Sequence, residues 1–123
     1  MYSEKIMNEF YNVENFDVIK GASGVGKVTS EVGNEIIKIY IKVERDTVVE
    51  AKFQTFGGVV AIAATSVANR LIVGKTLTEL KKFNANKIIA ELGDVPENKK
   101  YILPLVASAV VDAVDNYFEK SGR

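Results

Sequence analysis

The sequence predicts an α+β fold, in which helices pack on one face of a three-stranded antiparallel sheet. Apolar residues alternate with polar ones through residues 36–43 and again through 48–56, as expected of strands that are buried on one side. The turn between these runs is short and polar, which favours an antiparallel hairpin. After residue 59 the apolar residues recur at helical spacing, so strands come first and helices follow.

The amino-terminal half is expected to hold one helix and three strands. Residues 2–12 have apolar side chains at helical spacing, and Ser3 is placed to cap this helix. A third strand is expected at residues 27–32, ahead of the hairpin. For the strand 48–56, the alternation assigns one face to Val49, Ala51, Phe53 and Thr55.

The carboxyl-terminal half is expected to be helical. Helices are predicted at residues 60–71, 76–83, 86–92 and 102–119. Thr76 and Glu79 have the spacing of a capping box at the start of the second of these helices. No linker rich in Pro, Gly or Ser divides the chain, so residues 1–123 are interpreted as one domain.

Composition excludes several classes of function. The chain has 123 residues with 16 basic and 16 acidic side chains, and it contains no Cys and no His. A Ser-His-Asp or Cys-His catalytic site is therefore impossible, and we expect no enzyme. Because the basic and acidic residues balance, the net charge does not point to a nucleic-acid partner. The apolar run at residues 57–64 is far shorter than the ~20 residues of a membrane span, so we expect a cytoplasmic protein without a membrane segment.

One segment is similar to a phosphate-binding loop. It begins at Gly21 and ends at Lys27, with the spacing G-x-x-x-x-G-K. Val28 stands where that motif needs a Ser or Thr for magnesium, and the following residues predict a strand in place of a helix. Nucleotide binding is therefore the weakest of the functional interpretations, and the segment is interpreted as the glycine-rich approach to a strand.

Long stretches of the chain resemble one known family. They include the opening MYSEKIMNEF, the strand IIKIYIKV, the segment AKFQTFG followed by AIA, the turn LIVGKTL, and the closing pattern around Leu92, Gly93, Pro96 and Lys99. These stretches resemble the iron–sulfur cluster assembly scaffolds of the IscU and NifU N-terminal type. The resemblance covers essentially the whole chain, and it implies the α+β fold described above.

The resemblance also implies where that family keeps its chemistry, namely in three Cys with an Asp and a His nearby. The Cys positions correspond to Gly33, Gly58 and Ile102, the His position to Tyr101, and the Asp position to Glu35. Thiolates are the ligands that hold iron and accept sulfur. One carboxylate cannot replace them, so we expect no metal and no cluster at this site.

The replaced positions predict an apolar patch that includes Gly33, Gly58, Val59 and Ile102, framed by Tyr101 and Glu35. The first functional hypothesis is a degenerate scaffold that acts as an interaction module for a cysteine desulfurase or an intact scaffold. Partner contacts are then expected at Tyr2, Val95, Pro96 and Lys99. The alternative is a small-molecule binder that uses the apolar patch.

Overall fold

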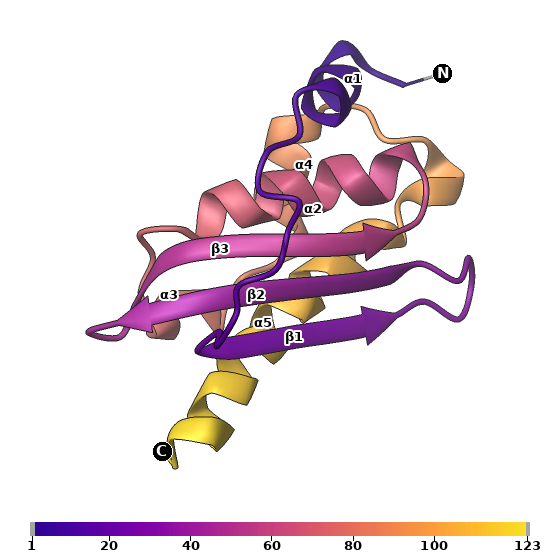
Figure 1. Cartoon of the computed structure of the whole chain (residues 1–123). Coiled ribbons are helices and arrows are strands. Elements are labelled where there is room, and N and C mark those ends of the chain that lie inside the picture. Colours follow the sequence, from indigo (N-terminus) through magenta and orange to yellow (C-terminus); the bar gives the residue numbers. More distant parts are fainter. Residues whose placement is uncertain (1, 123) are drawn as a thin grey trace.

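The computed structural model describes residues 2–122 and confirms the α+β arrangement, with helices on one face of the sheet (Figure 1). The strands are β1 (Gly24–Thr29), β2 (Ile36–Glu44) and β3 (Thr47–Phe56), and they are antiparallel in the order β1-β2-β3. The helices are α1 (Glu4–Tyr11), α2 (Val59–Ile72), α3 (Leu77–Leu80), α4 (Ala85–Leu92), the 3-10 turn η1 (Glu97–Lys99) and α5 (Ile102–Ser121).

The hairpin of β2 and β3 forms as predicted, but one face assignment is wrong. Arg45 and Asp46 both have positive φ, which suits the tight turns that join antiparallel strands. A bulge interrupts the register beside Lys42, so two residues of β3 stand opposite one residue of β2. The bulge turns Val48 into the core at 0% exposure and leaves Val49 43% exposed. The simple alternation had placed Val49 with the buried residues.

Strand β1 begins three residues earlier than predicted. Its first residues include two glycines that let α5 pack closely against the strand. A Cβ on Gly26 would lie 2.1 Å from the carbonyl oxygen of Ala109 in α5, and a Cβ on Gly24 would lie 2.4 Å from that of Ala113. Helix α5 therefore passes directly beneath the backbone of β1, which only glycine allows. Because two of residues 24–26 are glycines, the alternation of side chains gave no clear strand signal there.

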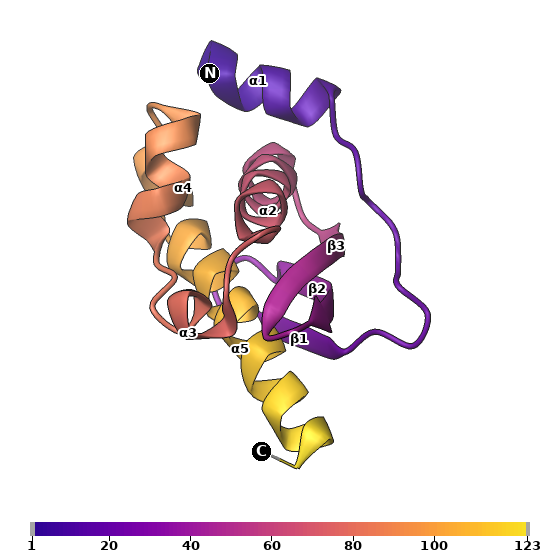
Figure 2. The ribbon, with the colours of Figure 1, turned by 90° about the vertical axis from the view of Figure 1, so that its left-hand side faces the viewer.

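Helix α2 is the centre of the structure. Figure 2 shows it enclosed by the sheet, α1, α4 and α5, and ten of its residues are buried, including the polar Thr65, Ser66 and Asn69. The expected capping by Ser3 and the capping box of Thr76 with Glu79 are both present. Helix α4 starts one residue earlier than predicted.

Helix α5 fills the space under β1 and β2. Together with the turn before it, residues Glu97–Ser121 are long and apolar enough to cross a membrane by length and composition alone. Core helices pass the same test, and 44% of the apolar stretch is buried inside the fold. Side chains of its buried face, such as Val106 and Val110, are at most 1% exposed. We therefore interpret α5 as a core helix.

Candidate functional site

The three segments that carry the predicted site meet at one end of the sheet. Ile36, the first residue of β2, pairs with Phe56, the last residue of β3. The loop that precedes β2 therefore lies beside the Gly57–Gly58 turn that leads into α2. The start of α5 reaches the same place, because the Tyr101 hydroxyl donates a hydrogen bond to the Glu35 carboxylate at 2.6 Å.

The pair formed by Glu35 and Tyr101 closes the centre of this region. Glu35 is 4% exposed, and its Oε1 has no hydrogen-bond partner among residues 2–122. The hydrogen bond from Tyr101, together with desolvation and the nearby negative charge of Glu35, raises the pKa of the Tyr101 hydroxyl. The hydroxyl therefore stays protonated at neutral pH and remains a donor to the carboxylate.

Gly33 has no space for a side chain. A Cβ placed on it would lie 2.2 Å from the Tyr101 hydroxyl and 2.7 Å from each oxygen of Glu35. A Cβ on Gly57 would lie 3.0 Å from Cγ of Glu35 and 2.9 Å from Cβ of Ala61. Gly58 differs, because a Cβ there would meet nothing within 4 Å. The volume in front of Gly33 is thus already occupied by the two side chains that frame it.

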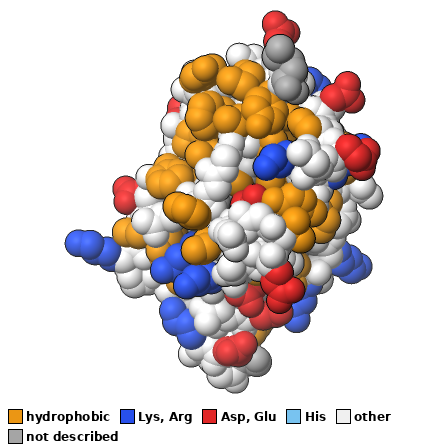
Figure 3. Space-filling model, turned by 90° about the vertical axis from the view of Figure 1, so that its right-hand side faces the viewer, with side chains coloured by type: hydrophobic (Ala, Val, Ile, Leu, Met, Phe, Trp, Pro, Cys, Tyr) orange, Lys and Arg blue, Asp and Glu red, His pale blue; other side chains and the backbone are white. Residues whose placement is uncertain are grey.

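The surface around this pair is partly apolar, but its residues differ from those of the predicted patch. Val32 is 78% exposed, Gly33 and Gly58 are exposed, and Val59 and Tyr101 are half-buried. We call these five residues the site face. Ile102 is only 1% exposed, so its predicted place in the patch is wrong: as the first residue of α5, it points into the core. Figure 3 shows hydrophobic side chains gathered over this side of the molecule.

The predicted partner-contact residues lie in two neighbouring segments. The Ser3 hydroxyl donates a hydrogen bond to the Leu92 carbonyl, so the amino terminus lies against the end of α4 and the loop that follows it. Tyr2, Pro96 and Lys99 are half-buried. Val95 is 7% exposed and packs against the core, so it supports the loop and offers little contact area of its own.

The segment from Gly21 to Lys27 has no cradle for a phosphate. Most of it is strand β1, and its outward amides are already bonded: Val25 donates to the side chain of Asn116 and Lys27 donates to that of Asp112. No helix follows the segment, since the next element is β2. These amides cannot turn toward an anion, and nucleotide binding here has no geometric support.

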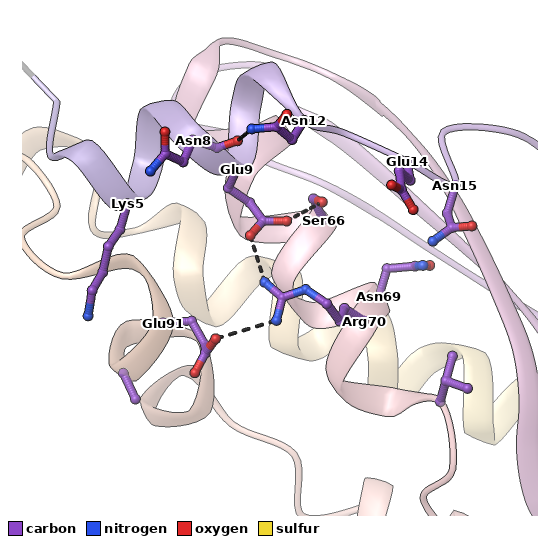
Figure 4. Close-up of a pocket in the computed structure, with 12 residues that line it drawn as sticks. Lys5, Asn8, Glu9, Asn12, Glu14, Asn15, Ser66, Asn69, Arg70 and Glu91 are labelled. Atoms are coloured by element: carbon purple, nitrogen blue, oxygen red, sulfur yellow. Dashed lines mark hydrogen bonds and ion pairs between the residues drawn. The ribbon is translucent and has the colours of Figure 1, made fainter.

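A polar hollow that the sequence did not suggest lies between α1, α2 and α4 (Figure 4). Its volume is about 670 Å³. Arg70 bonds Glu9 at 2.6 Å and Glu91 at 3.4 Å, and Ser66 donates to Glu9 at 2.6 Å. Burial lowers the pKa of Arg70, but the two glutamates outweigh it and raise the net value. These contacts tie α1 to α2 and α4. No periodicity could have revealed them, because their partners lie 21 to 61 positions apart.

The predicted small-molecule site does not coincide with the hollows that lie beside the helices. Within residues 2–122, no three Asp, Glu, His or Cys side chains gather closely enough to hold a metal ion. Three hollows lie beside α1 and α2, beside α4, and beside the middle of α5. None of these three is lined by Gly58, Val59 or Ile102, the residues of the predicted small-molecule site.

Comparison with known proteins gives one consistent result. Residues 1–123 match the family described as NifU-like N terminal domain. The chain is 38% identical to the iron-sulfur cluster assembly scaffold protein IscU 1 of Archaeoglobus fulgidus, over all of this chain and 80% of that protein. It is 36% identical to the nitrogen fixation protein NifU of Nostoc, over 94% of this chain but only 41% of that protein.

A solved structure agrees with these sequence matches. It is a putative iron-sulfur cluster assembly scaffold protein for the SUF system from Fervidobacterium islandicum. It superimposes with a TM-score of 0.78 at 24% identity, over 92% of this chain and 96% of that one. At this identity the likeness supports the fold alone, and the sequence matches carry the relationship.

Proposed function

The chain belongs to the family of NifU-like N-terminal domains, related to the iron–sulfur cluster assembly scaffolds, and from that premise we propose that it is a cluster-free member acting as a protein-interaction module. The observation that carries the proposal is the Tyr101–Glu35 pair, which fills the space in front of Gly33. We propose no enzymatic turnover and no resident cofactor.

The residues present do not fit a cluster. By the family resemblance, Gly33, Gly58 and Ile102 stand at the three Cys positions, and none of them has a donor atom in its side chain. A [2Fe–2S] cluster needs ligands such as thiolates on each iron. Glu35 is the one carboxylate there, and it is buried and already bonded to Tyr101. A cluster would have to displace this pair and would still lack ligands.

The site face supports a role in binding. None of its side chains is a metal ligand, yet Val32 is exposed and Val59 and Tyr101 are half-exposed. These residues lie beside the loop that carries Pro96 and Lys99. Apolar side chains with a polar rim are common in protein interfaces. We propose that the partner is a cysteine desulfurase or an intact scaffold. This chain would bind the partner without receiving sulfur or iron.

A binding experiment with matched variants tests the proposal. The chain is titrated into the cysteine desulfurase of the same organism, with an expected Kd of about 10 μM or tighter. Val32→Asp with Val59→Asp is expected to weaken binding by about tenfold or more, because charges replace apolar contacts at the centre of the face. Val49→Asp with Val73→Asp is the control, since these residues are 43% and 44% exposed at the other end of the sheet.

Several outcomes would overturn the proposal. One is the absence of a complex with both the desulfurase and an intact scaffold at about 100 μM, a concentration well above the Kd of functional encounters. Another is an equal loss of binding in the two pairs of variants. Stoichiometric iron on chain purified without oxygen would also contradict it, because the pair in front of Gly33 leaves iron no ligand set.

A further inference from the structure

The outer face of the sheet, opposite the helices, carries a second surface. Side chains alternate along the strands, so those that do not enter the core lie on this face. The strand register places Lys27, Lys38 and Gln54 side by side in one row, which we call the lysine row. The next row contains Thr29, Ile36 and Phe56, which we call the apolar row. The two rows are about 7 Å apart, the span of two residues in a strand.

Both rows are accessible. Lys27, Gln54 and Thr29 are exposed, Phe56 is 70% exposed, and Lys38 and Ile36 are half-buried. The connection between α1 and β1 crosses this side of the sheet (Figures 1 and 2), where its backbone bonds Phe53. Tyr40, the aromatic residue of the next row, is only 7% exposed. The lysine row and the apolar row are the part of the face nearer the ends of β1 and β3.

The two lysines have no partner that explains their pairing. Lys27 and Lys38 are directly opposite each other on β1 and β2, and like charges in that arrangement destabilise a sheet. The ion pairs described for residues 2–122 involve Arg70 and Lys100, and neither of these two lysines. Lys38 lies 5.2 Å from the centre of the Tyr40 ring, which orients its stem but does not neutralise its charge.

We propose that this surface binds an acidic, amphipathic segment of a partner protein. Carboxylates of the segment would meet the lysine row, and its apolar side chains would meet Ile36 and Phe56 one row away. Charge complementarity argues for an anionic partner, and the exposed Phe56 beside the lysines argues for one with apolar side chains. The inference goes beyond the proposed function. The apolar row borders the site face, but the lysine row lies apart from it on the outer face of the sheet, so variants of the two lysines test this inference separately.

A nucleic acid fits this surface less well than a polypeptide. Its phosphates would run beyond the two lysines and meet Glu31 at one end of the sheet and Glu44 and Glu50 at the other. The chain as a whole has no net charge, with 16 basic and 16 acidic residues. The counterion release that drives binding to nucleic acids would therefore be small. An acidic segment of a few residues can satisfy the lysine row alone.

The test uses defined polyanions and the intact chain. Fluorescein-labelled copolymer of Glu and Tyr, poly-L-glutamate and oligothymidylate of similar charge are titrated at low and at physiological salt, with fluorescence anisotropy as the readout. The copolymer is expected to bind more tightly than poly-L-glutamate, because its tyrosines reach the apolar row. Binding is expected to weaken with salt.

Charge-reversal variants locate the binding. Lys27→Glu with Lys38→Glu is expected to weaken binding of the copolymer by about tenfold or more. The control is Lys82→Glu with Lys87→Glu, which changes the net charge equally at exposed positions outside the sheet and is expected to change binding less than about twofold. Lys27→Gln with Lys38→Gln removes the two positive charges without introducing negative ones. It keeps the test valid if the charge-reversed variant fails to fold. Equal losses in both charge-reversed variants, tighter binding of oligothymidylate, or no binding at low salt would each overturn the proposal.

Discussion

Replacing Gly33 with Ser tests whether the site is closed by packing. The new Cβ would lie 2.2 Å from the Tyr101 hydroxyl and 2.7 Å from both oxygens of Glu35, closer than real Cβ contacts. Glu35 cannot swing away freely, because it is 4% exposed and its Cγ lies close to Gly57, so the half-buried Tyr101 is the side chain that must move. The substitution must therefore separate Tyr101 from the carboxylate.

The loss of stability comes from the Glu35 carboxylate, which stays buried without its hydrogen-bond donor. A buried carboxylate that loses its donor is destabilising by about 2 kcal/mol. For 123 residues, the entropy of unfolding is about 0.26 kcal/mol/K, so this cost lowers the melting temperature by about 8 °C. Gly58→Ser is the matched control, because Gly58 is the N-cap of α2 and a Cβ there meets open space. Serine can cap that helix, so the control is expected to gain about 0.5 kcal/mol or stay unchanged.

Thermal unfolding followed by circular dichroism measures both variants, and urea unfolding gives the free energies. The pKa of Tyr101, read from the NMR shifts of its ring during an alkaline titration, should fall toward the ordinary value in Gly33→Ser alone. If Gly33→Ser melts within about 2 °C of Gly58→Ser, a difference below about 0.5 kcal/mol, the space in front of Gly33 is not closed. The structural basis of the proposed function would then be lost.

Three further substitutions test other parts of the structure. Gly26→Ala is expected to cost about 3 kcal/mol in urea unfolding, because its methyl group would collide with the backbone of α5 on a strand that cannot move away. Tyr101→Phe tests the raised pKa: the hydroxyl stabilises the fold fully below its ordinary pKa near 10, and this contribution disappears as the pH rises through the higher folded value. The stability difference between wild type and Tyr101→Phe should therefore be constant up to about pH 10 and shrink above it. Lys27→Glu is expected to raise the free energy of unfolding by about 0.5 kcal/mol, because it turns the like-charged pair with Lys38 into an opposite-charged one. A lower free energy of unfolding would contradict the charge argument.

The elements that the sequence predicted best are those whose signal is local. The alternation of apolar residues in residues 36–43 and the spacing of Thr76 and Glu79 each depend on contacts within a few positions, and both were confirmed. The errors arose where contacts with distant segments determine the local structure. The bulge that buries Val48 depends on the register with β2, and the early start of β1 depends on α5 lying beneath its glycines.

The site shows the same division. The family resemblance could align Gly33 and Tyr101 with ligand positions, but it could not show that the Tyr101 hydroxyl reaches Glu35 across 66 positions of sequence. Nor could it show that Ile102 faces the core, since the first turn of α5 reads as apolar on more than one side. The lysine row was also invisible, because pairing of Lys27 with Lys38 exists only once the strand register is known.

Gly33, Glu35 and Tyr101 make physical sense only together. Glycine at position 33 creates a space, and the Tyr101 hydroxyl and the Glu35 carboxylate fill it with a mutual hydrogen bond. Any side chain at position 33 collides with this pair, and without the Tyr101 hydroxyl the buried carboxylate of Glu35 would lose its donor. A cysteine introduced at position 33 would likewise meet the tyrosine hydroxyl and could be accommodated only if Tyr101 moves. Opening space for a side chain at position 33 therefore requires Tyr101 to move or to be replaced.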